Sequence, residues 1–127
     1  MVVAELSPGQ AADVAGIGVQ TAEALHPSGA PALILRLNLR GTVIAYTGDT
    51  AWTDVLPRAT GGADLLIAEA YRMDNAVPFH LRHADLAARR HLLNSARIVL
   101  THMGPDVLSR LGEVLFETAR DGLVLEI

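Results

Sequence analysis

The chain has no cysteine, which excludes disulfides, thiolate metal sites and cysteine nucleophiles. Aromatic residues are also scarce, at 4% of a chain that is 50% hydrophobic, so its core must be built from Ala, Val, Leu and Ile. No apolar stretch approaches the roughly 18 residues that a membrane-spanning segment needs. The N-terminus also lacks the basic start of a signal peptide. We therefore expect a cytoplasmic protein with no membrane partner.

Length and charge narrow the class further. A chain of 127 residues is enough for one domain but not comfortably for two. The formal net charge of −4 argues against a broad nucleic-acid-binding surface, which would be basic. A local basic patch is still compatible with the sequence, either at Arg72 with Arg82 or at Arg89 with Arg90.

The order of apolar patterns predicts an α/β layer protein. Residues 17–25 alternate apolar and polar side chains, as a half-buried strand does. Residues 63–68 form the continuous apolar run of a buried parallel strand, and a 3.6-residue stripe predicts a helix over 105–120. The complete expectation comprises strands at 2–6, 17–25, 32–38, 42–47, 63–68, 97–101 and 123–127, and helices running through Arg58 from a cap at Thr50 or Thr53, over 84–95 and over 105–120.

Two of the expected strands end at residues that can bind a metal ion. Asp49 follows the apolar run 42–45 within Tyr-Thr-Gly-Asp-Thr, and His102 follows the run 98–101. A strand end holds a ligand rigidly, and the loop after it is open to substrate. Two such ends from neighbouring strands would place a carboxylate and an imidazole side by side.

A third candidate, His26, also follows an expected strand. Two histidines and one carboxylate suit Zn²⁺, Mn²⁺ or Fe²⁺. Taken singly, each residue has a simpler interpretation: a strand-end histidine as a capped surface residue, and Asp49 as a turn or N-cap residue. Glu69 ends a strand as well, and the sequence leaves open whether it orients a metal ligand or is merely a solvated strand end.

The remaining histidines are less informative. His80 and His83 resemble a ligand pair, but true helical pairs prefer a spacing of four residues, and His80 precedes the expected helix. His91 lies inside that helix with no partner at metal-ligand spacing, so we interpret it as structural.

The set of motifs is more specific than its members. Five motifs follow one another in order: a strand ending at His26, a hairpin ending in Gly-Asp-Thr, a buried strand ending at Glu69, the loop Phe-His-Leu at 79–81 and the strand ending in Leu-Thr-His-Met-Gly at 100–104. This order resembles the C-terminal half of the metallo-β-lactamase fold superfamily, in the branch of ribonuclease Z and related phosphodiesterase-type hydrolases. The resemblance covers almost the whole chain.

The resemblance implies a fold and a set of roles. The fold would be half of an αββα sandwich, a mixed sheet with helices on one face. His26 corresponds to the lone histidine on the first metal, Asp49 to the carboxylate that bridges both metals, and His102 to the last histidine, on the second metal. His80 corresponds to the histidine that donates a proton to the leaving group, and we prefer it to His83, which lies at the helix start. The metal, zinc or else manganese or iron, would activate water for attack on a phosphodiester or RNA-like substrate.

One hallmark of the family is missing. Its His-x-His-x-Asp-His loop lies in the N-terminal half, and this sequence contains no His-x-His anywhere. Residues 1–127 therefore correspond to the second half of the fold, as a fragment of a longer enzyme or as a natural half-protein. With at most three ligands left, metal binding should be weak or partial.

The sequence thus leaves three hypotheses. The first is a metal-dependent hydrolase half, inactive or nearly so alone, and the second is a degenerate half-domain that acts as an interaction or regulatory module. The third is an unrelated small α/β binding domain. In a half-fold, the sheet face lined by alternate residues of 32–38 and 42–47 should be apolar and bare. We expect a second copy of the chain or the missing half to cover it.

Overall fold

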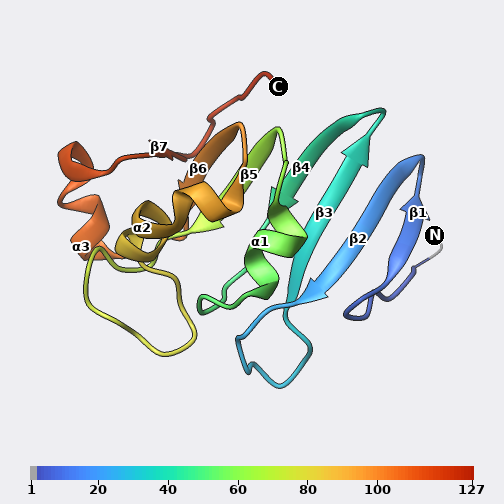
Figure 1. The fold of residues 1–127 in the computed structure, drawn as a ribbon, viewed down its shortest axis with the longest axis horizontal. Helices are drawn as coiled ribbons and strands as arrows, with labels where there is room; N and C mark the ends of the chain where they lie inside the picture. Colours follow the sequence, from blue (N-terminus) through green and yellow to red (C-terminus); the bar gives the residue numbers. More distant parts are fainter. Residues whose placement is uncertain (1–2) are drawn as a thin grey trace.

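The computed structural model describes residues 3–127, which fold into a mixed sheet with helices packed on one side (Figure 1). The seven strands of this part of the chain lie in sequence order across the sheet. Their bounds are β1 Ala11–Val14, β2 Ile17–Glu23, β3 Leu33–Leu39, β4 Thr42–Tyr46, β5 Leu65–Glu69, β6 Arg97–Thr101 and β7 Glu117–Thr118. The helices are α1 Val55–Thr60, α2 His83–Leu93 and α3 Pro105–Leu108, followed by a 3-10 turn at Leu111–Glu113. The expected α/β class and mixed sheet are confirmed.

The direction of the strands changes in the middle of the sheet. Strands β1 to β4 form an antiparallel meander, whereas β4, β5, β6 and β7 run parallel to one another. The parallel strands need crossover connections, and α1 and α2 supply the first two. As a result, the carboxyl ends of β4, β5 and β6 meet at one edge of the sheet, where Glu69 pairs in register with Thr101.

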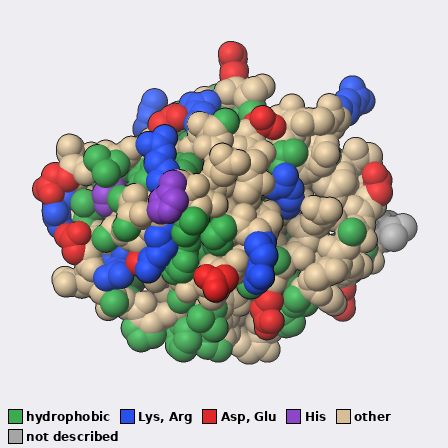
Figure 2. All heavy atoms as spheres, in the orientation of Figure 1, with side chains coloured by type: hydrophobic (Ala, Val, Ile, Leu, Met, Phe, Trp, Pro, Cys, Tyr) green, Lys and Arg blue, Asp and Glu red, His purple; other side chains and the backbone are tan. Residues whose placement is uncertain are grey.

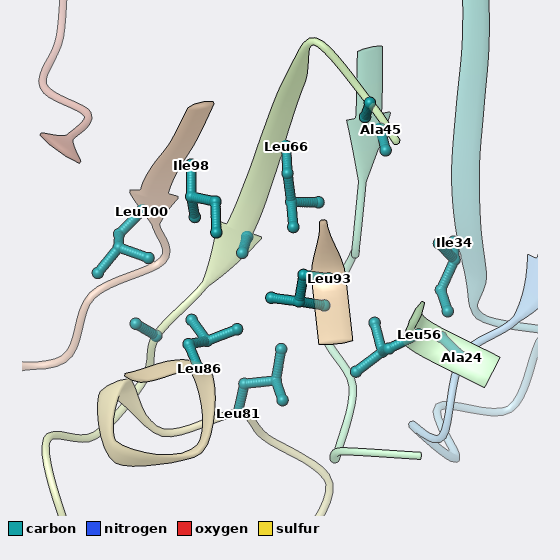
Figure 3. Close-up of a cluster of buried hydrophobic side chains, with 13 residues drawn as sticks. Ala24, Ile34, Ala45, Leu56, Leu66, Leu81, Leu86, Leu93, Ile98 and Leu100 are labelled. Carbon is teal, nitrogen blue, oxygen red and sulfur yellow. The ribbon is translucent and has the colours of Figure 1, made fainter. Parts of the chain in front are cut away.

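The core lies between the sheet and helices α1 and α2 (Figure 3). Leu56 of α1 and Leu86 of α2 are at most 1% exposed, and they belong to one cluster with Leu66 and other buried residues of the sheet. Burying one such leucine stabilises the fold by about 1.5–3 kcal/mol. These leucines fix the helices on the sheet and thereby fix the loops at the strand ends. Within residues 3–127, no helix is long and apolar enough to cross a membrane.

The opposite face of the sheet is apolar and carries neither α1 nor α2. Leu35 is paired in register with Tyr46, and Leu37 with Ile44, so these four side chains share one face. They alternate with Ala45, which belongs to the core on the helix side. Leu35, Leu37 and Ile44 are half-buried, and Tyr46 is 37% exposed. The expected apolar composition of this face is therefore confirmed.

The N-terminal prediction is wrong. Residues 3–6 of the expected strand 2–6 form no strand, and residues 1–2 lie outside the described part of the chain. The first strand is instead β1, whose small and polar residues show no alternation. The feature that marks this strand is the two-residue turn Ala15-Gly16, which connects β1 to β2 in a tight hairpin. Its φ values are 54° and 81°.

The predicted helix over 105–120 is also wrong. Only Pro105–Leu108 is α-helical, and the chain then turns to place Glu117–Thr118 beside β6. Val107 is buried and Val114 packs against the core, but Leu111 and Leu115 of the same apolar stripe are 47% and 68% exposed, so the stripe does not face the core as one continuous helix. The open edge of β6 instead bonds this segment, since Ala119 N–H donates to Leu100 O.

Two smaller expectations fail as well. Residues 123–127 form no strand. Neither Thr50 nor Thr53 caps α1, because Asp54 occupies the N-cap position and makes no side-chain cap. The Thr50 hydroxyl accepts from Leu25 N–H and donates to Ala51 O, which ties the loop after β2 to the loop after β4.

Candidate metal and acid–base site

The carboxyl edge of β4, β5 and β6 gathers four metal-ligand side chains. Asp49 follows β4, Glu69 ends β5, His102 follows β6 and His80 lies in the loop before α2. One ligand atom from each residue lies within 4.8 Å of the others. The parallel arrangement of the three strands accounts for this meeting, because parallel strands end at the same edge. We call these residues the strand-end cluster.

Glu69 is the buried centre of the strand-end cluster. It is 1% exposed, and its Oε1 accepts hydrogen bonds from the backbone N–H groups of Thr50 (2.6 Å) and Leu81 (3.2 Å). Its Oε2 lies 2.9 Å from His80 Nδ1 and 3.4 Å from His102 Nδ1. The carboxylate therefore joins the loops after β4 and before α2 and orients the imidazole of His80. Of the two interpretations that the sequence left open, the solvated strand end is wrong.

Asp49 and His102 form the solvent-facing side of the cluster. His102 Nδ1 lies 2.8 Å from Asp49 Oδ1, and the two side chains are 43% and 36% exposed. The expected pairing of a carboxylate with an imidazole is thus present, but the two strands are not neighbours as expected, because β5 lies between β4 and β6. Within residues 3–127, the Asp49 carboxylate has no ion-pair partner besides His102, so its other oxygen is free to bind a ligand from solvent.

Two further rings line the cluster. The His26 ring centroid lies 5.0 Å from that of His80, edge to face. Tyr71, directly after β5, stacks at 4.7 Å from His80 and 5.4 Å from His102. His26 is therefore next to the cluster but is not one of the four residues whose ligand atoms converge. No sequence motif marks Tyr71; its position two residues after the strand-end residue Glu69 is the only signal that could have found it.

His102 adopts a backbone conformation that is uncommon for a residue with a side chain. Its φ is +48°, in the left-handed region. Such strain persists where the surroundings over-determine it, and it concentrates at functional sites. The conformation turns the chain sharply after β6 and directs the imidazole back toward Asp49.

The other histidines lie elsewhere. His83 is 6% exposed, its Nε2 accepts from Leu115 N–H at 3.0 Å, and its ring packs on Phe116. Burial lowers the pKa of His83, and Arg110 lowers it further, against the opposing effect of Asp74. His83 is thus a structural residue that anchors the segment before β7. His91 is exposed on α2 and outside the cluster.

The donor set of the cluster fits a divalent metal ion. It offers only carboxylate oxygens and imidazole nitrogens, the set that suits Zn²⁺, Mn²⁺ or Fe²⁺. Asp49 and His102 would hold the ion, since both face solvent. Glu69 is engaged by two backbone N–H groups and fits the role of an orienting acceptor for His80.

A mixed sheet with helices on one face and this donor set at its strand ends defines the class of metallo-β-lactamase-type folds. The family model described as the beta-lactamase superfamily domain matches residues 1–103, and the chain belongs to that superfamily. Among curated proteins, no sequence matches the chain.

Solved structures agree on the fold. The metallo-beta-lactamase fold protein YhfI from Bacillus subtilis is similar at a TM-score of 0.80 and 20% identity, over 95% of this chain and 54% of that one. A diphosphatase from the PhnP family has a TM-score of 0.76 and 19% identity, over 95% and 47%. Human tRNase Z, short form (ELAC1), has a TM-score of 0.69 and 23% identity, over 91% and 45%. The chain thus spans about half the length of these solved structures.

Proposed function

We propose that this chain supplies part of the active site of a metal-dependent hydrolase that cleaves phosphodiester or related ester bonds. The observation that supports the proposal most directly is the Glu69–His80 contact beside Asp49 and His102. A buried carboxylate that orients an imidazole at 2.9 Å is an arrangement suited to general acid–base catalysis.

The residues divide the work. Asp49 and His102 would hold the metal, and His26, whose ring is adjacent to His80 but whose ligand atoms are not among those that converge, would be a third ligand. When bound, the ion acts as a Lewis acid on the substrate and lowers the pKa of a nearby water. His80, held by Glu69 through Nδ1, donates a proton to the leaving oxygen from its other ring nitrogen.

Elemental analysis tests the metal assignment. Chain purified without chelator should carry zinc, manganese or iron at less than one ion per chain, because the sequence lacks His-x-His. Asp49→Ala should abolish this content, whereas His91→Ala, which removes an exposed histidine outside the cluster, should leave it unchanged. Equal metal content in both variants would refute the assignment.

Turnover separates the proposal from its alternative, a half-domain that acts as an interaction or regulatory module. That alternative is favoured by the missing His-x-His. The chain alone should hydrolyse bis-p-nitrophenyl phosphate very poorly or not at all. Addition of a separately expressed N-terminal half of a related hydrolase should raise the rate in the native chain but not in Asp49→Ala. No gain in the native chain would favour the interaction module.

A further inference from the structure

The arginines of this chain fall into two groups. All ten of its cationic side chains other than histidine are arginines. Five of them pair with carboxylates: Arg72, Arg82, Arg89, Arg97 and Arg110. The other five have no ion pair within residues 3–127: Arg36, Arg40, Arg58, Arg90 and Arg120.

The ion pairs neutralise most of the two basic patches that the sequence allowed, Arg72 with Arg82 and Arg89 with Arg90. Arg82 and Arg89 both bond Asp85 at 2.8 Å, and Arg72 lies 3.7 Å from Asp106. Arginine side chains without an ion pair instead gather at another part of the surface, since three of the five unpaired arginines line one groove.

The groove consists of two adjoining cavities of about 470 and 480 Å³, which share Ala11, Gln20 and Arg36. It lies on the helix side of the sheet, because Arg36 is two residues from the core residue Ile34 on the same strand. Arg58 of α1 lines the first cavity, and Arg40 of the β3–β4 turn lines the second. Figure 2 shows this face, with separate blue side chains over and beside α1 and at the upper right.

Arg36 is held in place at the centre of the groove. Its Nη1 donates to Gly61 O at 2.9 Å, just after α1, and the side chain is half-buried. The rest of its guanidinium has no partner within residues 3–127. An arginine fixed in this way and partly removed from water binds an anion at a low entropic cost.

The rest of the lining is complementary to an anion. None of the described residues that line the two cavities is acidic, and the amides of Gln10, Gln20 and Asn38 add hydrogen-bond donors. Asp13 shares this face through its register with Gly18, but it lines neither cavity. Its Oδ1 instead accepts from Gly16 N–H within the β1–β2 turn.

We propose that this arginine groove, defined by Arg36, Arg40 and Arg58, binds a run of consecutive phosphates. Arg58 lines the first cavity, Arg40 lines the second and Arg36 lines both, so the three cationic groups are spread along the whole groove and match a ligand with several phosphates in a row. None of the described lining residues is aromatic, so the groove offers no stacking platform for bases. The ligand is therefore recognised by its phosphates, in a polyphosphate or in a nucleic-acid backbone. None of the strand-end cluster lines the groove.

Two probes distinguish these sources. A fluorescein-labelled ten-nucleotide single strand is titrated with the native chain by anisotropy, and sodium tripolyphosphate is titrated by calorimetry. Both are measured at 50 mM salt with EDTA present, so that no metal at Asp49 captures phosphate. Saturable one-to-one binding of either probe supports the groove, and the probe that binds identifies the source. No binding of either probe overturns the proposal.

Matched variants locate the binding. Arg58→Gln and Arg40→Gln should each weaken binding about tenfold, as expected for a lost charge-assisted contact. Each should also reduce the slope of log affinity against log salt by about 0.7 for a single strand. Arg90→Gln and Arg120→Gln remove the same charge from unpaired arginines outside the groove and should change little. Equal losses in both pairs would show only a net-charge effect and would overturn the proposal.

Discussion

Replacement of Glu69 by alanine is expected to loosen two loops at once, because a single carboxylate holds both. Its Oε1 accepts from the buried N–H groups of Thr50 and Leu81 at 2.6 and 3.2 Å. Each buried donor left without a partner costs about 1–3 kcal/mol. Glu69→Ala should therefore lower the free energy of unfolding by about 2–6 kcal/mol, before any cavity term.

Glu69→Gln distinguishes the two halves of the carboxylate. The glutamine keeps an oxygen for the two backbone donors but places an amide opposite His80 Nδ1. Only the charge-assisted contact at 2.9 Å is then weakened, for a loss of about 1–2 kcal/mol. The glutamine variant should thus lie between the native chain and Glu69→Ala.

Urea unfolding followed by fluorescence measures these differences, because Trp52 is the only tryptophan and lies two residues after Thr50. Native-state hydrogen exchange adds a local readout: the amides of Thr50 and Leu81 should exchange faster in Glu69→Ala than in Glu69→Gln. Glu23→Ala, at an exposed glutamate on β2, is the matched control and should change neither measurement. If Glu69→Ala were as stable as that control, the role assigned to the buried carboxylate would be wrong.

Three further predictions follow from the packing. Gly104→Ala would drive a Cβ into the backbone oxygen of Tyr71, so it should destabilise the chain by about 1–3 kcal/mol in urea unfolding, whereas Gly112→Ala, with open space around it, should not. The pKa of His83 is held below its usual 6.5 mainly by burial, so the unfolded chain binds a proton more readily than the folded chain. The free energy of unfolding should therefore fall as the pH drops below about 6.5, and His83→Gln should reduce this dependence on pH. If a second copy of the chain covers the apolar sheet face, sedimentation at low micromolar concentration should show a dimer that Leu37→Asp on this face dissociates, and a native monomer would contradict dimerisation through it.

The strands that sequence patterns located well are those whose surroundings match the pattern. The continuous apolar run of β5 is buried between two parallel neighbours, and the Gly-containing loop at 39–41 closes the β3–β4 hairpin. The apolar stripe over 105–120 predicted one helix wrongly because periodicity does not distinguish a continuous helix from a short helix and an irregular segment that bury some of the same residues. Gly112 interrupts that stripe, and the segment after it makes backbone hydrogen bonds with the edge of β6 instead of continuing the helix.

The site shows the same division. Strand-end placement brought Asp49 and His102 into contact as predicted, although through β4 and β6 on either side of β5 and not through neighbouring strands; the inference needed only parallel strands that end at one edge. The burial of Glu69 and the stacking of Tyr71 depend on how the loop 71–82 folds back over the strand ends, which no local pattern specifies. His26 remains a predicted ligand, placed beside His80.

The backbone at His102 has a consequence for how this sequence would drift. A φ of +48° suits glycine or asparagine, and an imidazole there costs the fold about 1 kcal/mol relative to them. A population selected for folding alone would lose this histidine before the buried residues around it. Related sequences that no longer need an imidazole at this position should therefore acquire Gly or Asn at position 102 before they change the buried residues around it. The residue at this one position can thus indicate whether a related protein still uses the site.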